Sequence, residues 1–95
     1  MVIQSGTFNI HDNLALREGD GTRNARLPVS FPNPFIGSTP TVAVSLTGFD
    51  ASNQERVRVW VNAEQIDNAG FVAVAQTWVN SSLAAVWGTW IAYQD

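Results

Sequence analysis

The chain concentrates side chains that can bind a polar ligand in one short stretch, Arg-Glu-Gly-Asp-Gly-Thr-Arg at residues 17–23. The 95-residue sequence has only five basic and eight acidic residues, and five of these lie within ten positions. They are Arg17, Glu18, Asp20, Arg23 and Arg26. An ionised aspartate accepts hydrogen bonds from two neighbouring hydroxyl groups, and an arginine donates to the same oxygens through its planar fork. These residue types therefore favour a hydroxyl-rich ligand such as a sugar.

Arginine and tryptophan alternate with valine in a second stretch, ERVRVWVNA at residues 55–63. The two arginines and Trp60 would share one face of a strand, because side chains two residues apart point the same way. An aromatic ring can cover the apolar C–H face of a pyranose. The alternative is a solvated face with ion pairs to Glu55 or Asp20, which would contribute little free energy. A shallow sugar site would bind at millimolar affinity, about −4 kcal/mol, and repetition in an oligomer would add avidity.

Catalytic and metal-binding sites are poorly supported by the residues present. The one histidine, His11, has no G-x-S-x-G turn near it that would position a nucleophilic serine. The absence of cysteine excludes thiolate ligands, and Asp12, Glu18 and Asp20 do not follow the spacing of an EF-hand calcium loop. A glycine-flanked polar loop also lacks the burial that the acid of a glycoside hydrolase requires. We therefore expect a non-catalytic protein with no cofactor and no metal.

Composition argues against several kinds of partner. The formal net charge is −3 and lysine is absent, so no nucleic-acid partner is expected. No apolar run approaches the roughly 20 residues of a membrane span, so no membrane insertion is expected. The N-terminal MVIQSGTF lacks the basic and apolar regions of a secretion signal. The compartment is left undecided, and an extracellular or cell-surface location is compatible with this composition.

Apolar and polar residues alternate with a period of two along the chain, and no segment sustains a helical period. The expected strands are residues 2–9, 26–31, 41–49, 55–63, 71–79 and 83–93. Residues 10–25 are predicted to form a long polar loop, and Pro28 places its strand at a sheet edge or a bulge. The pattern predicts an all-β single domain over residues 1–95, a six-stranded antiparallel β-sandwich.

Several of the expected strands carry apolar side chains on both faces, which six strands cannot bury by themselves. Val72 and Val74 alternate with Phe71 and Ala73, and Trp60 shares a face with two arginines. Exposed apolar patches of this kind usually mark contacts between proteins. We therefore expect a homo-oligomer, although scattered exposed apolar residues are also common on monomers.

Three stretches of the sequence together resemble the H-type lectin domain family, which includes snail agglutinins and the C-terminal domain of slime-mould discoidins. They are SFPNPFIGSTPTVAVSLTGFD, ERVRVWVNAEQIDNAGFVAVAQTWVNSS and WGTWIAY. The resemblance is carried by the order and spacing of Pro-Phe, the Pro-x-Val strand, the Arg-Val-x-Val strand, Thr-Trp and Trp-Ile-Ala. It implies a six-stranded antiparallel sandwich that assembles as a trimer, or as stacked trimers in a hexamer. It also implies binding of galactose or N-acetylgalactosamine in clefts between protomers.

The resemblance assigns candidate site residues one by one. Asp20 matches the family's sugar-binding aspartate, Arg58 its sugar-binding arginine and Trp78 its site tryptophan. Gly19 and Gly21 lie where the loop backbone approaches the sugar. The glycine-permitted turns and the neighbouring arginines would hold this loop so that it presents Asp20 to sugar hydroxyls.

The chain departs from the family at two positions on the rim of this site. Val79 and Ala84 stand where well-known members carry a histidine and an aromatic residue, so a polar partner and a stacking ring are missing. Two functions follow as hypotheses. The first is a multivalent lectin for galactose- or N-acetylgalactosamine-type glycans without catalysis. The second is a structural or interaction trimer, such as a fibre-tip or surface-decoration module, with a degenerate sugar site.

Overall fold

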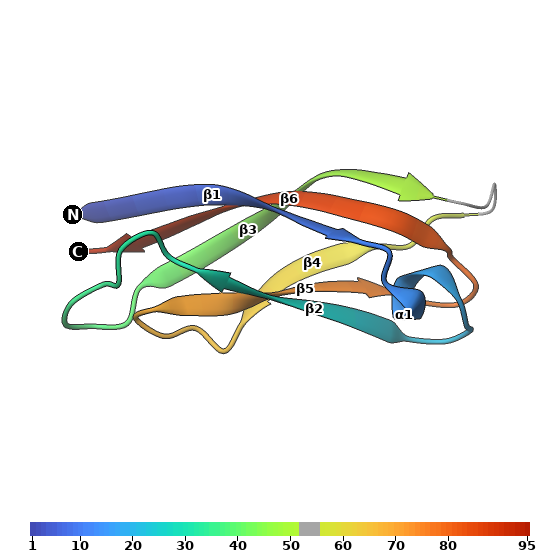
Figure 1. The fold of residues 1–95 in the computed structure, drawn as a ribbon, viewed down its shortest axis with the longest axis horizontal. Helices are drawn as coiled ribbons and strands as arrows, with labels where there is room; N and C mark the ends of the chain where they lie inside the picture. Colours follow the sequence, from blue (N-terminus) through green and yellow to red (C-terminus); the bar gives the residue numbers. More distant parts are fainter. Residues whose placement is uncertain (52–55) are drawn as a thin grey trace.

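The computed structural model describes residues 1–51 and 56–95, and within them six strands form two three-stranded antiparallel sheets (Figure 1). One sheet has the order β1-β6-β3 and the other the order β2-β5-β4. The strands are β1 (Val2–His11), β2 (Arg23–Ser30), β3 (Thr41–Ala51), β4 (Trp60–Glu64), β5 (Gly70–Thr77) and β6 (Leu83–Gln94). The sheets pack face to face around buried side chains, which confirms the predicted all-β sandwich.

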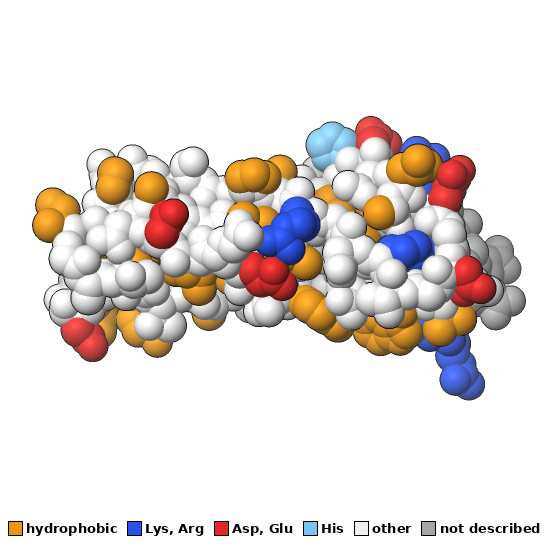
Figure 2. Space-filling model, turned by 90° about the horizontal axis from the view of Figure 1, so that it is seen from below, with side chains coloured by type: hydrophobic (Ala, Val, Ile, Leu, Met, Phe, Trp, Pro, Cys, Tyr) orange, Lys and Arg blue, Asp and Glu red, His pale blue; other side chains and the backbone are white. Residues whose placement is uncertain are grey.

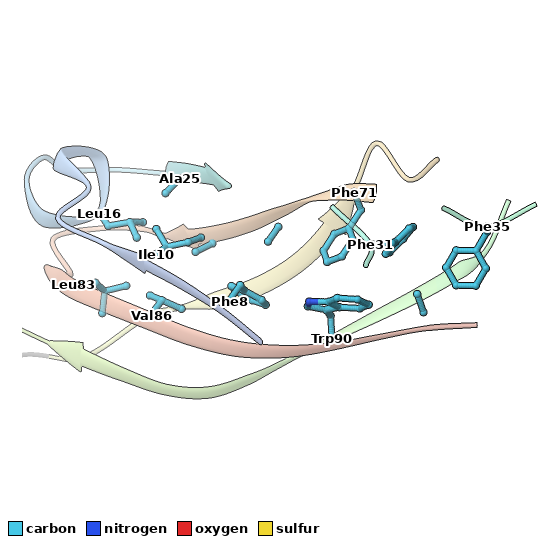
Figure 3. Packing of buried hydrophobic residues seen from close by; sticks show 13 residues of the cluster. Phe8, Ile10, Leu16, Ala25, Phe31, Phe35, Phe71, Leu83, Val86 and Trp90 are labelled. Atoms are coloured by element: carbon cyan, nitrogen blue, oxygen red, sulfur yellow. The ribbon is translucent and has the colours of Figure 1, made fainter. Parts of the chain in front are cut away.

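The core between the sheets has an aromatic half and an aliphatic half (Figure 3). In the aromatic half, the ring centroid of Phe31 lies 5.1 Å from that of Phe35 and 5.5 Å from that of Trp90, in edge-to-face and tilted arrangements. The aliphatic half contains Ile10, Leu16, Leu83 and Val86. The molecule is elongated and measures 45 × 19 × 17 Å. The two halves of the core occupy opposite ends of this long sandwich.

One turn of helix, α1 (Leu14–Arg17), closes the aliphatic end, where the sequence predicted only loop. Its N-cap is Asn13, whose side chain accepts a hydrogen bond from the Ala15 N–H. Leu16 is 1% exposed and fills the space between the sheets at this end. A single turn is too short to give a helical period in the sequence. Within the described residues, no helix is long and apolar enough to cross a membrane.

Strand β4 begins at Trp60, later than the predicted start at residue 55, which lies outside the described residues. The preceding backbone is bonded to hydroxyl side chains instead of to a neighbouring strand. Arg58 donates its N–H to Ser81 Oγ at 3.1 Å and accepts from Thr77 Oγ1 through its carbonyl. Val57 and Val59 still pack against the core, so the alternation that suggested a strand is preserved.

One further expectation about the strands is settled by the sheet order. β2 is an edge strand, as Pro28 indicated. Trp90 is buried and Trp87 is exposed, so these two residues of β6 face opposite sides of their sheet.

Gly88 on β6 faces the core directly opposite Phe8 on β1, and the aromatic ring occupies the space that a side chain would need. A Cβ atom at position 88 would lie 2.2 Å from Cζ of Phe8. We therefore expect Gly88→Ala to lower the free energy of unfolding by about 1–3 kcal/mol through overpacking, measured by thermal or urea denaturation.

The matched control is Gly48→Ala on β3 in the same sheet, where the added Cβ would make an ordinary 3.4 Å contact with Trp87. This variant should unfold close to the parent. Equal stability of the two variants would contradict the packing described for Phe8.

Candidate functional site

Three segments that are distant in sequence meet at the α1 end of the sandwich (Figure 1). They are the segment after α1 at residues 18–22, the segment before β4 at residues 56–59, and the turn between β5 and β6 at residues 78–82. The Gly21 N–H donates to the Val79 carbonyl at 3.0 Å, and the Arg58 N–H donates to Ser81 Oγ at 3.1 Å. These bonds bring the segments that carry the predicted site residues to one end of the protein.

Arg23 holds these segments together through its guanidinium group. Nε donates to the Gly21 carbonyl, and Nη1 donates to the carbonyls of Ala15 and Glu18. Nη2 donates to the carbonyls of Val79 and Ser81, both at 2.9 Å. All five N–H groups of the guanidinium are thereby used. The sequence predicted that neighbouring arginines hold the charged loop, and in the structure Arg23 does so.

Asp20 stands exposed between two glycines that adopt positive φ angles, +117° at Gly19 and +80° at Gly21. Residues with side chains rarely adopt this backbone conformation, so the two glycines permit the sharp turn that projects Asp20. Asp20 Oδ1 accepts a hydrogen bond from the Gly21 N–H at 2.9 Å. Among the described residues it has no ion-pair partner, and its second carboxylate oxygen remains available for a ligand.

The Arg58 side chain points outward from the β2-β5-β4 sheet, because its neighbours Val57 and Val59 pack against the core. Its Nη1 donates to the Arg56 carbonyl at 3.2 Å. No carboxylate in the described part of the chain pairs with it. Donors on this guanidinium are therefore free to reach a bound ligand.

Trp78 comes directly after β5, at the start of the turn that bonds to the segments carrying Asp20 and Arg58. The ladder between β4 and β5 ends where Trp60 lies opposite Gln76, and Arg58 and Trp78 each lie two residues beyond that pair. On the other side of β5, Arg23 lies opposite Thr77, which places Thr22 beside Trp78. Trp78 is half-buried. Asp20, Trp78 and Arg58 thus lie on three segments that meet at the α1 end, next to the β2-β5-β4 sheet.

The rim positions Val79 and Ala84 offer a ligand only apolar side chains. Val79 has a φ of +59°, which is unusual for a β-branched residue. Its carbonyl accepts from both Gly21 and Arg23, and these two bonds hold the strained conformation. Ala84 is half-buried, and its carbonyl accepts from the Asp12 N–H at 3.3 Å.

Thr77 and Ser81 are further functional residues of this end that the sequence did not single out. Both are buried, and their hydroxyl groups fix the backbone that carries Arg58. Ser81 Oγ also donates to the Arg56 carbonyl at 2.9 Å. The only signal in the sequence is a pair of hydroxyl residues flanking the turn, which is ordinary turn composition.

Charged side chains gather at the α1 end of the face seen in Figure 2, with an acidic and basic pair nearer the middle. Arg26 Nη1 and Glu64 Oε1 lie 2.9 Å apart and form one ion pair of the described residues. The only other ion pair of the described residues joins the exposed Arg17 and Asp12 at 3.8 Å. In the same part of the chain, no three His, Cys, Asp or Glu side chains are grouped so that they could hold a metal ion.

Comparison with known proteins identifies relatives of this chain. The family model described as H-type lectin domain matches residues 26–93. A protein of Fuscovulum blasticum described as "ATP synthase subunits region ORF 7" is 39% identical over 74 residues, which cover 78% of this chain and 64% of that protein. The matched region therefore spans less than two thirds of this curated relative.

Solved structures of discoidin II from Dictyostelium discoideum share the fold. The recombinant protein superposes with a TM-score of 0.86 at 27% sequence identity, over 96% of this chain and 36% of that chain. The wild-type protein gives a TM-score of 0.87 at 26% identity, over 98% and 36% respectively. The present chain is thus similar to about one third of discoidin II.

We expect Arg23→Lys to lower the free energy of unfolding by about 2–4 kcal/mol, because one ammonium group cannot satisfy five carbonyls in a fixed fork. For a chain of this size, each kcal/mol lost from the free energy of unfolding lowers Tm by about 4–8 °C. Calorimetry or circular dichroism would measure the change.

The control is Arg17→Lys, which alters only a long, exposed ion pair and should change stability by less than about 0.5 kcal/mol. If the Arg23 variant had the same Tm as this control, Arg23 would not be the residue that holds the three segments together.

Proposed function

Because the chain belongs to the H-type lectin domain family, we propose that it binds carbohydrate at the α1 end and catalyses no reaction. The observation that carries this proposal is an exposed Asp20 carboxylate and an Arg58 guanidinium, each without an ion-pair partner among the described residues. A ligand with neighbouring hydroxyl groups uses both of them.

The chemistry of the site residues suits a pyranose. Asp20 accepts hydrogen bonds from two adjacent hydroxyls, and Arg58 donates to the same oxygens. Trp78 covers the apolar C–H face of the ring, and the positive φ of Gly21 lets the loop backbone come close. Galactose and N-acetylgalactosamine offer this combination of a hydroxyl pair and an apolar face, and we take them as the ligand class. The proposed lectin-like unit comprises residues 1–95.

The proposal also includes a homo-oligomer, a trimer or a hexamer, that presents several weak sites at once. Support comes from the outer face of the β1-β6-β3 sheet, where large apolar side chains stand in register without cover. They are Ile3, Trp87, Ile91 and Tyr93, with exposures of 38–56%. A patch of this kind favours contact with other copies of the chain. Sugar clefts between protomers would then gain avidity through repetition.

A second candidate function is a structural or interaction trimer that has lost sugar binding. It is favoured by Val79 and Ala84, which place neither a polar group nor an aromatic ring at the rim. The two candidates share the fold and the oligomer. They differ in whether the purified protein binds any immobilised galactose- or N-acetylgalactosamine-containing glycan.

Asp20→Asn should weaken binding of galactose and N-acetylgalactosamine about tenfold to hundredfold, because it removes a charge-assisted acceptor worth roughly 1.5–3 kcal/mol. Arg58→Lys should weaken sugar binding to a similar extent, because the point charge of a lysine does not reproduce the planar fork of a guanidinium. Calorimetric titration on the folded oligomer is the measurement.

Asp12→Asn and Arg17→Lys are the matched controls, because both residues are exposed at the same end but outside the proposed site. They should leave affinity unchanged. Sugar binding that survives both site substitutions would place the sugar site elsewhere. A parent protein that binds no glycan would favour the second candidate function, a structural or interaction trimer.

Light scattering after size exclusion should give a mass of three chains or a multiple of three at micromolar concentration. Ile91→Glu should shift the protein to smaller species, because it places a charge in the middle of the exposed apolar face. Ile36→Glu is the control, since Ile36 is 90% exposed on the connection between β2 and β3. A monomer mass for the parent would refute the oligomer.

A further inference from the structure

A second row of side chains lies next to the candidate sugar site on the outer face of the β2-β5-β4 sheet. Asn24 on β2 pairs with Gln76 on β5, and Gln76 pairs with Trp60 on β4, so the three residues stand side by side across the sheet. Trp60 points outward because Val59 and Val61 pack against the core, and it is 37% exposed. The row thus combines an accessible indole ring with two amide groups.

This row is the last of the ladder between β4 and β5, and Arg58 and Trp78 lie two residues beyond it on their respective segments. Positions two residues apart on a strand are separated by about 7 Å and face the same side of the sheet. That separation is comparable to the displacement between neighbouring rings of a glycan. A sugar chain anchored at Asp20 and Arg58 and running along β4 would therefore place its next ring over Trp60.

The polar groups of this row have no partner in the described part of the chain. No side-chain hydrogen bond is made there by the amides of Asn24 and Gln76 or by the indole N–H of Trp60. The next row differs, because Arg26 and Glu64 form an ion pair between the edge strands and Val74 beside it is only 2% exposed. Asn62 in that next row also lacks a side-chain partner among the described residues, but no aromatic ring stands in its row.

The surroundings of Trp60 favour a solvated, ligand-accessible surface over a contact with another copy of the chain. Its neighbours on this face include the polar Asn24, Arg26 and Asn62, and Val74 between the last two is only 2% exposed. Large apolar side chains without cover stand instead on the outer face of the other sheet. A tryptophan ring flanked by amides is suited to stack on a sugar ring and bond to its hydroxyls.

We propose that Asn24, Gln76 and Trp60 form a second sugar subsite, continuous with the site at Asp20 and Arg58, so that the protein prefers an extended saccharide to a single galactose. Trp60 stacks on the second ring, and the two amides exchange hydrogen bonds with its hydroxyls. This subsite rests on the sugar-binding function proposed above, since it extends the same ligand.

The test is calorimetric titration of the parent, Trp60→Ala and Gln76→Ala with three probes. These are galactose, lactose, and a digalactoside that extends galactose from its non-reducing side. The parent should bind at least one of the disaccharides about tenfold more tightly than galactose. Trp60→Ala should abolish this gain and leave galactose affinity unchanged, and Gln76→Ala should reduce the gain. Asn62→Ala, on β4 but outside the row, is the control and should bind like the parent.

The remaining outcomes overturn the subsite in different ways. If the parent binds galactose and the disaccharides equally, the row does not contact the sugar. The same holds if the Trp60→Ala variant keeps the higher affinity for a disaccharide. Equal weakening of all probes by Trp60→Ala makes Trp60 part of the first site. A changed mass in light scattering makes Trp60 a contact between chains. A parent that binds none of the probes refutes the proposed sugar-binding function itself, and with it the subsite.

Discussion

The organisation of the α1 end depends on one guanidinium group and five carbonyl oxygens. Arg23 lies at the start of an edge strand, yet its side chain bonds to the backbone of α1, of the loop after it and of the turn between β5 and β6. Residues 18–22 are all exposed, so this loop cannot rely on buried apolar contacts. Here an internal cation supplies the order instead, and it is itself satisfied completely.

The core of the sandwich changes in composition along its length. Aromatic rings fill the half of the core remote from α1, whereas small aliphatic side chains fill the half beneath the candidate site. At the site the backbone before β4 leaves the regular ladder, and the hydroxyls of Thr77 and Ser81 satisfy it. The backbone before β4 is thus irregular where it meets the turn between β5 and β6.

The fold was predictable from alternation and turn composition because each strand is short, half-buried and bounded by polar residues. The single turn α1 was not, since four residues carry no period. The candidate residues Asp20, Arg58 and Trp78 came from a family resemblance, and the coordinates bring their segments together. Contacts such as Arg23 to Ser81 join residues far apart in sequence and depend on tertiary position, which neither composition nor spacing encodes.

The turn after β5 is held by its carbonyl groups and buried hydroxyls, not by the side chain of Val79 at its tip. Its shape is therefore largely independent of which residue occupies that tip. This residue can therefore be exchanged without rebuilding the scaffold beneath. The same independence makes this turn a practical place to graft new recognition chemistry onto a small, cysteine-free domain.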